Sequence, residues 1–192
     1  MTDPLSKKRS SLNSEQKKSV DSMIEGWDSP NGAFILPIVE GPPGTGKTTV
    51  GVVAALTYAR ENKKNQVCYL CFTNQSADGV LEDFVKFGAT PGEVQRVTDK
   101  SRSHRLNGCG YSEYYIGYDD EQIDLSPNDK RRLTNTPILI STLHGANKAF
   151  KHRRRPLVII DEFSQVPPNM FFSTVQKARK TGNPEGYVLL GD

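Results

Sequence analysis

The stretch GPPGTGKTT, from Gly41 to Thr49, constrains the fold of this chain more than any other segment. It follows a short apolar run, AFILPIVE, and precedes VGVVAALTYAR, which has the composition of a helix. This order is that of a P-loop: a strand, a glycine-rich turn that ends in Lys-Thr, and the start of a helix. The backbone amides of the turn and the helix N-terminus hold phosphate oxygens. The residues predicted to bind the nucleotide are Gly41, Pro42, Pro43, Gly44, Thr45, Gly46, Lys47, Thr48 and Thr49.

Lys47 and Thr48 carry the chemistry that this pattern predicts. The Lys47 ammonium reaches the β- and γ-phosphates, and the Thr48 hydroxyl is a ligand for Mg²⁺. The alternative, a surface turn rich in Gly and Pro, does not explain the strand before it and the helix after it. We therefore predict that the chain binds and hydrolyses a nucleoside triphosphate with Mg²⁺.

An acidic pair supplies the second half of such a site. Asp161 and Glu162 follow the apolar run LVII, which is typical of a strand buried on both faces of a parallel sheet. At the carboxyl end of that strand, Asp161 would hold Mg²⁺ and Glu162 would act as general base on the attacking water. The alternative is a surface acidic pair after a core strand, and the P-loop favours the catalytic interpretation.

These motifs resemble those of superfamily 1 helicases. DEFSQ is similar to the DEAxQ motif of their Upf-like branch, although Phe163 stands where that motif has a small residue. The resemblance makes Gln165 a catalytic residue that hydrogen-bonds water or the γ-phosphate. SLNSEQKKSV is similar to the Q motif, which implies ATP as the nucleotide and assigns Gln16 to the adenine edge, because an amide both donates and accepts.

The resemblance extends to later segments in the same order. YLCFTNQSADGV is similar to motif Ia, ILISTLHGA to motif Ic and YVLLGD to the opening of motif III. It implies that single-stranded DNA or RNA is a partner. The expected contacts with its backbone are Thr73, Asn74 and Thr142.

Apolar runs and helical patterns alternate along the chain, which predicts an α/β fold. We expect a P-loop NTPase with a RecA-like, mostly parallel sheet and helices on both faces. Strands are expected at 34–39, 67–72, 94–98, 138–142, 157–161 and 187–190. Helices are expected at 14–26, with Ser14 as N-cap, and at 47–62, 76–87, 144–151 and 168–179. Residues 1–13 are expected to form a basic, flexible lead, and 14–192 the ATP-binding domain.

Two polar segments leave alternatives open. Residues 103–136 form an insertion that is either a mobile surface loop or a stacking and phosphate-contact surface, with Arg102, Arg105, Tyr111, Tyr114, Tyr115 and Tyr118. The basic run 151–155 looks like a nucleic-acid patch. It precedes the strand that ends at Asp161, so it belongs at the edge opposite the P-loop, and we interpret it as a solvated turn or a secondary contact.

The sequence ends at Asp192, inside the segment that resembles motif III. Helicases of this family need a second RecA-like domain, whose arginines reach the γ-phosphate. We expect this chain to be the first motor domain of a longer helicase, weakly active or inactive alone, with the second domain supplied in cis or in trans. The alternatives are a stand-alone P-loop NTPase and a helicase-derived interaction module.

Composition is consistent with this interpretation. The net charge of +3 is mildly basic, which is consistent with a nucleic-acid partner, and no signal peptide or membrane-length apolar run is present. We expect an intracellular protein, cytoplasmic or nuclear, without a membrane partner. Cys68 and Cys71 form a C-x-x-C pattern within one expected strand, where residues three apart point to opposite faces and cannot chelate one ion.

Overall fold

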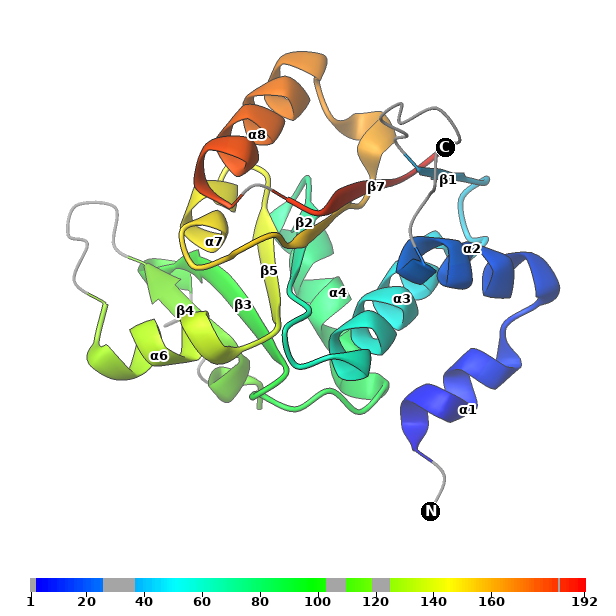
Figure 1. Ribbon diagram of the computed structural model, residues 1–192, viewed down its shortest axis with the longest axis horizontal. Helices are drawn as coiled ribbons and strands as arrows, with labels where there is room; N and C mark the ends of the chain where they lie inside the picture. Colours follow the sequence, from blue (N-terminus) through cyan, green and yellow to red (C-terminus); the bar gives the residue numbers. More distant parts are fainter. Residues whose placement is uncertain (1–2, 26–36, 103–109, 119–124, 183) are drawn as a thin grey trace.

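A single parallel sheet organises the molecule (Figure 1). The computed structural model describes residues 3–25, 37–102, 110–118, 125–182 and 184–192. Seven strands among them pair in the order β1-β7-β6-β2-β5-β3-β4, and every pair is parallel. Their bounds are β1 Ile38–Glu40, β2 Val67–Cys71, β3 Val94–Asp99, β4 Tyr115–Tyr118, β5 Ile138–Thr142, β6 Leu157–Ile160 and β7 Gly186–Gly191.

Helices cover both faces of this sheet, and two separate apolar clusters fill the spaces between the layers. One face carries α1 Pro4–Ser11, α2 Ser14–Glu25, α3 Lys47–Glu61 and α4 Asn74–Lys86. The other face carries α6 Pro127–Asn135, α7 Ala146–Phe150 and α8 Pro168–Thr181. The predicted α/β fold with a parallel, RecA-like sheet and helices on both faces is confirmed. The strand expected at 34–39 is described only from residue 37 and runs from 38 to 40.

Strand β2 lies at the centre of the sheet and is buried along its whole length. The alternation of its side chains places Cys68 in the cluster below α7 and α8, and Cys71 in the cluster below α3 and α4. Tyr69 shares the face of Cys71 and packs edge-on against Phe84 of α4, with ring centroids 5.9 Å apart. The expectation that the two cysteines face opposite ways is therefore met.

Helix α3 is apolar on nearly all sides because it runs between α2, α4 and the sheet. It begins at Lys47, directly after the glycine-rich loop, so its N-terminus lies at the carboxyl edge of the strands. Gly51 lets it approach the sheet: a Cβ there would lie 2.6 Å from Leu190 Cδ1 and 2.7 Å from the Tyr69 hydroxyl. This close approach fixes the P-loop relative to β2 and β7.

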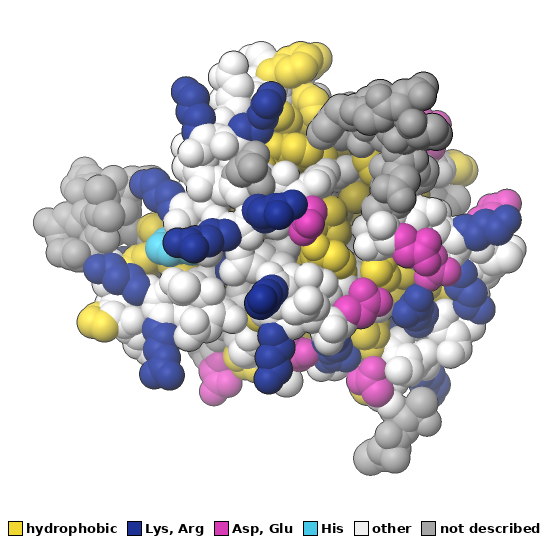
Figure 2. All heavy atoms as spheres, in the orientation of Figure 1, with side chains coloured by type: hydrophobic (Ala, Val, Ile, Leu, Met, Phe, Trp, Pro, Cys, Tyr) yellow, Lys and Arg dark blue, Asp and Glu magenta, His cyan; other side chains and the backbone are white. Residues whose placement is uncertain are grey.

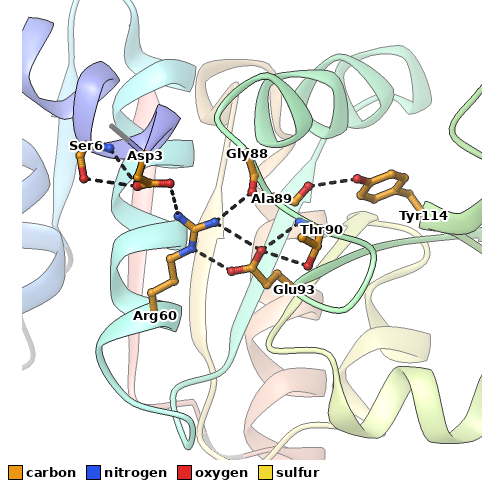
Figure 3. Close-up of polar contacts among 8 residues, drawn as sticks. All are labelled: Asp3, Ser6, Arg60, Gly88, Ala89, Thr90, Glu93 and Tyr114. Atoms are coloured by element: carbon orange, nitrogen blue, oxygen red, sulfur yellow. Dashed lines mark hydrogen bonds and ion pairs between the residues drawn. The ribbon is translucent and has the colours of Figure 1, made fainter. Parts of the chain in front are cut away.

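The N-terminal segment differs from the expected flexible lead, because Pro4–Ser11 is a helix. Its Leu5 is buried, and Asp3 caps its start by accepting from the Ser6 amide. Figure 3 shows how Arg60 of α3 joins this cap to the rest of the domain. Its guanidinium lies 3.4 Å from Asp3 Oδ1, donates to the Gly88 carbonyl at 3.0 Å and pairs with Glu93 at 2.8 Å.

The start of α2 also differs from its prediction. Asn13, not Ser14, caps the helix: its Oδ1 accepts from the Gln16 amide at 2.8 Å, and Gln16 Oε1 accepts from the Asn13 amide at 3.0 Å. This reciprocal pair is a capping box, with Asn in place of Ser or Thr. The Gln16 side chain is therefore held in a fixed position by its own helix.

The described parts of the polar insertion, residues 110–118 and 125–136, pack onto the sheet and extend it. Strand β4 extends the sheet beside β3, and α6 packs its buried Leu133 against the core. The Tyr114 hydroxyl donates to the Ala89 carbonyl and the Tyr118 hydroxyl to the Lys148 carbonyl, so these phenols bond inwards. Burial raises the pKa of both Tyr115 and Tyr118 to about 12. Arg105, expected on a stacking surface, lies outside the described residues.

The basic run before β6 is only partly a solvated turn. Arg153 is 2% exposed and donates to the Thr136 carbonyl at 2.6 Å, so it tethers the end of α6 to this turn. Burial lowers the pKa of this guanidinium. Lys151 and Arg154 are exposed, and Figure 2 shows Lys and Arg side chains spread over the face formed by α7 and α8. In the part of the chain that is described, no helix is long and apolar enough to cross a membrane.

Candidate functional site: two cavities at the carboxyl edge of the sheet

The P-loop and the acidic pair meet in one cavity of about 390 Å³, which we name the nucleotide cavity. It lies where β6 and β7 end, in front of the N-terminus of α3. Its lining residues are Pro43, Gly44, Gly46, Lys47, Thr48, Thr49, Asp161, Glu162, Ser164, Gln165, Gly191 and Asp192. Gly41, Pro42, Thr45 and Gln16 line an adjoining hollow of about 370 Å³ together with Lys47.

Two glycines give the loop its shape. Gly44 and Gly46 have φ values of 80° and 83°, in the left-handed region that residues with a Cβ rarely adopt. A Cβ on Gly46 would also lie 3.1 Å from Gln16 Nε2. The loop therefore needs glycine at these positions to bring its backbone up to a ligand.

The Lys47 ammonium is directed to the base of the loop and to β7. It donates to the carbonyls of Gly41 and Pro42, and it lies 2.6 Å from Asp192 Oδ1. Lys47 is largely buried, whereas Asp192 is half exposed. Asp192 thus contacts the residue predicted to bind phosphate, a contact that residue patterns alone do not reveal because 145 positions separate the two.

Asp161 is buried and held by two hydrogen bonds. Its Oδ2 accepts from the Tyr69 hydroxyl at 2.9 Å, and its Oδ1 accepts from the Glu162 amide at 2.9 Å. Burial raises the pKa of Asp161 above its ordinary value, and these bonds and the neighbouring Thr48 hydroxyl oppose the rise. Sequence patterns identify Asp161 but miss Tyr69, which looks like an ordinary core residue of β2.

The Asp161 and Thr48 pair fits a magnesium ion. Both supply oxygen atoms, the ligands that Mg²⁺ prefers, and Mg²⁺ takes only one or two protein groups besides phosphate and water. Among the described residues no group of three or more His, Cys, Asp and Glu side chains could hold a metal. The Asp161 and Thr48 assignment does not depend on such a group.

Glu162 is fixed at both its backbone and its side chain. Its φ of 55° lies in the left-handed region, and Ser76 Oγ of α4 donates to Glu162 Oε2 at 2.6 Å. Gln165 belongs to the short helix η2, Phe163–Gln165, and its side chain is exposed at the cavity. Phe163, which departs from the DEAxQ pattern, packs edge-on against Phe171 of α8 at 5.2 Å.

Gln16 lies beside the loop, as the Q-motif resemblance predicts. Its Nε2 donates to the Thr45 carbonyl at 2.9 Å while its Oε1 accepts from the Asn13 amide. Both ends of the amide are thus engaged within the chain. The structure places Gln16 at the nucleotide side of the molecule, and its role toward adenine stays a prediction.

The three residues expected to contact nucleic acid also lie together. Thr73, Asn74 and Thr142 line a second cavity of about 380 Å³, which we name the strand-end cavity. Its lining residues are Phe72, Thr73, Asn74, Arg96, Val97, Thr98, Asp99, Ser141, Thr142, His144, Gly145 and Lys148. It lies where β2, β3 and β5 end, at the same edge of the sheet as the nucleotide cavity.

Hydrogen bonds within the chain hold the polar side chains that line the strand-end cavity. Thr73 caps α4 by accepting from the Ser76 amide at 3.0 Å, and Thr142 Oγ1 accepts from the Gly145 amide at 3.2 Å. Asn74 Oδ1 accepts from Arg96 at 2.7 Å. These contacts fix each side chain at the rim.

Arg96 lines this cavity too, although the sequence motifs do not single it out. It is fully buried, although it carries a charge, and Asp78 compensates it at 3.3 Å. Asp78 also pairs with Arg102. Burial lowers the pKa of Arg96, and the Asp78 carboxylate opposes that shift. An Arg in the middle of the expected strand 94–98 is the signal that could identify it, since a buried charge requires a partner.

Similar folds occur in solved helicase structures. The UvsW helicase from bacteriophage T4 matches with a TM-score of 0.58 and 16% identity over 97% of this chain and 58% of that chain. MrfA, a DUF1998 helicase solved with DNA and AMPPNP, matches with a TM-score of 0.57 and 15% identity over 100% of this chain and 26% of that one. The chain thus spans between about a quarter and just over half the length of these proteins.

At these identities the likeness shows the fold, which is that of a helicase-like P-loop domain. No curated protein sequence matches the chain. A family model described as an AAA domain matches residues 34–192, which is most of the chain. The chain therefore belongs to this AAA domain family.

Proposed function

We propose that this chain is the ATP-binding motor domain of a superfamily 1 DNA/RNA helicase of the Upf-like branch. In the full-length enzyme, ATP hydrolysis would be coupled to translocation along a single strand. One observation carries the proposal: the nucleotide cavity and the strand-end cavity open at the same edge of one sheet. The solved MrfA structure, with DNA and AMPPNP, supports it as a precedent for this fold.

In the nucleotide cavity, Lys47 would exchange its bond with Asp192 for the β- and γ-phosphate oxygens. Backbone amides of Gly44–Thr48 would hold the same phosphates at the N-terminus of α3. Thr48 and Asp161 would hold Mg²⁺, whose charge neutralises the phosphates. Glu162 would accept a proton from the attacking water, and Gln165 would hydrogen-bond that water or the γ-phosphate.

In the strand-end cavity, Thr73, Asn74 and Thr142 would contact phosphates of single-stranded DNA or RNA. Arg96 and Lys148 line the same cavity and favour an anion, although Asp78 and Asp99, with which they pair, reduce that effect. Contacts with the backbone carry no sequence information, so binding should be independent of sequence. Such a ligand is consistent with an intracellular location.

The partner implied by this function is a second RecA-like domain, in cis or in trans. Translocation needs two domains that grip the strand and move relative to each other. Arginines from the partner would stabilise charge on the γ-phosphate, an effect worth about 10³–10⁵ in rate in other NTPases. We therefore expect the 192-residue chain to hydrolyse ATP weakly and not to unwind a duplex.

Hydrolysis and binding by the Glu162→Gln variant test the proposal. Without its general base the variant should lose about 10²–10⁴ in hydrolysis rate, while its affinities for a fluorescent ATP analogue and a labelled single strand stay near those of wild type. Glu82→Gln, an exposed change on α4, is the matched control. Hydrolysis that is retained in Glu162→Gln would contradict the assigned site.

The same titrations separate the alternatives. ATP binding without oligonucleotide binding would indicate a stand-alone P-loop NTPase. Oligonucleotide or protein binding without ATP binding would indicate an interaction module. Binding of both ligands, with a weak hydrolysis that single strands stimulate, is the result expected for a motor domain.

A further inference from the structure

A pair of hydroxyl groups joins the two cavities. Thr73 lines the strand-end cavity, Glu162 lines the nucleotide cavity, and Ser76 in the first turn of α4 lies between them. Ser76 Oγ is 2.7 Å from Thr73 Oγ1 and 2.6 Å from Glu162 Oε2. The side chain that would receive a nucleic-acid phosphate is thus two hydrogen bonds away from the predicted general base.

The number of hydrogens fixes the direction of these bonds. Each hydroxyl carries one hydrogen, and a carboxylate oxygen can only accept. Ser76 uses its hydrogen on Glu162, so Thr73 must donate to Ser76 Oγ. Thr73 Oγ1 in turn accepts from the Ser76 amide at 3.0 Å. The order of donation is therefore Thr73 to Ser76 to Glu162.

Contacts at both the side chain and the backbone hold Glu162 in place. Its side chain is directed to α4 by Ser76, while its backbone has a φ of 55° and its amide donates to Asp161. A left-handed conformation at a residue with a Cβ persists only where surrounding contacts maintain it. While Oε2 accepts from Ser76, the carboxylate is not free to turn to a water beside the γ-phosphate.

We propose that Ser76 is a positioning residue that restrains Glu162 until a phosphate of the single strand accepts the Thr73 hydrogen. This inference rests on the proposed function. Hydrogen bonds in a chain strengthen one another, by roughly 10–30% per bond, so losing the donor at one end weakens the next bond. When Thr73 donates to a phosphate, Ser76 loses that donor, and its bond with Glu162 weakens. Glu162 then turns to the attacking water.

Single-turnover hydrolysis, with the chain in excess over ATP, tests this coupling despite a low rate. Ser76→Ala should raise the rate without nucleic acid by about threefold to tenfold, the scale of one hydrogen bond. It should also bring the ratio of stimulated to unstimulated rates close to one. Ser10→Ala is the matched control, because it removes a helix hydroxyl that bonds only the Ser6 carbonyl. An unchanged ratio in Ser76→Ala, with both rates equally reduced or equally preserved, would overturn the proposal.

Variants of Thr73 separate the relay from a purely structural cap. Thr73→Ser keeps the hydroxyl and should keep the stimulation ratio. Thr73→Val keeps the shape but removes the hydrogen, and it should raise the unstimulated rate and remove stimulation even at saturating oligonucleotide. Stimulation that survives in Thr73→Val at saturating oligonucleotide would show that the hydrogen bonds from Thr73 through Ser76 to Glu162 do not couple the two cavities.

A spectroscopic measurement does not depend on turnover. With carboxyl-labelled glutamate, the Glu162 resonance is assigned by its loss in Glu162→Gln. A single-stranded oligonucleotide should move this resonance in wild type and not in Ser76→Ala. If wild type binds oligonucleotide and ATP but the resonance stays in place, this inference fails and the proposed function stands. If wild type binds neither ligand, both fail.

Discussion

The nucleotide cavity takes half of its lining from one continuous segment, Pro43 to Thr49, whereas the strand-end cavity takes its lining from the ends of three strands and the segments that follow them. In the loop, glycines with positive φ and a helix N-terminus determine the geometry, so backbone conformation shapes the site. In the strand-end cavity, Thr73 and Thr142 each accept from an amide three residues further along the chain, whereas Asn74 accepts from Arg96 of β3, 22 positions away. The loop of the first site is shaped by its own backbone, whereas the second site also depends on the network around Arg96.

The largest effect should come from the network, because it is buried. Arg96→Leu removes a fully buried charge that bonds Asn74 and Asp78. The change leaves Asn74 without this partner and Asp78 with Arg102 alone, so it should lower the free energy of unfolding by about 3 kcal/mol, the lower end for breaking a buried ion pair, as measured by urea denaturation. The exposed Arg131→Leu change on α6 is the control and should have little effect. An unchanged denaturation midpoint in Arg96→Leu would show that the two cavities do not differ in this way.

Lys47→Ala should affect chemistry without a comparable loss of stability. The ammonium lies near the loop carbonyls and Asp192, where it would meet the β- and γ-phosphates. Removing a positive charge aimed at the reacting phosphate should reduce hydrolysis by about 10²–10³-fold. Phosphate release measures the effect, and the exposed Lys86→Ala serves as control. Steady phosphate release by Lys47→Ala would place the reaction at another site.

Tyr69→Phe tests how β2 supports the acidic half of the nucleotide cavity. Burial raises the pKa of Tyr69 well above its ordinary value, so it is a permanent donor to Asp161. Loss of the Tyr69 hydroxyl removes a hydrogen bond to the Asp161 carboxylate, and this raises the pKa of Asp161 further. Mg²⁺ needs the carboxylate, so Mg²⁺-dependent nucleotide binding should weaken by less than about tenfold, and its lower pH limit should move upward.

Binding of a fluorescent nucleotide against pH, with and without Mg²⁺, measures this shift. Tyr69→Phe removes one oxygen atom from a packed ring and leaves no room for a water molecule. Tyr58→Phe is the control, since that hydroxyl bonds Glu185 far from the loop. Identical pH profiles for Tyr69→Phe and wild type would show that Tyr69 fills space without orienting Asp161.

The difference between the two cavities also explains what the sequence predicts well. Gly44, Lys47 and Asp161 follow from local patterns because a P-loop and a strand end are written in consecutive residues. The alternation that separates Cys68 from Cys71 is equally local. Contacts across the sheet, such as Tyr69 with Asp161, leave no such pattern, since 92 positions separate the two residues.

The errors have the same origin. Residues 1–13 look flexible by composition, yet Arg60 and the buried Leu5 dock Asp3 and helix α1 onto the domain (Figure 3). Tyr115–Tyr118 looks like part of a loop because the segment is short, and it is a strand because it pairs with β3. Arg153 looks solvated within a basic run, but the Thr136 carbonyl lies close enough to bind it. Each case needed a tertiary partner that the sequence does not name.

The smallest effect is expected at Gln16, which lies where local and distant contacts meet. Its amide bonds Asn13 in its own helix and Thr45 in the P-loop. If a second hydrogen or lone pair of that amide also reads the adenine edge, Gln16→Ala should weaken ATP by about threefold to tenfold and GTP by less. Titrations of both nucleotides decide this, with the exposed Lys17→Ala as the neighbouring control. Equal losses for ATP and GTP would instead mean that Gln16 only holds the loop through Thr45, and that base selection lies with other residues.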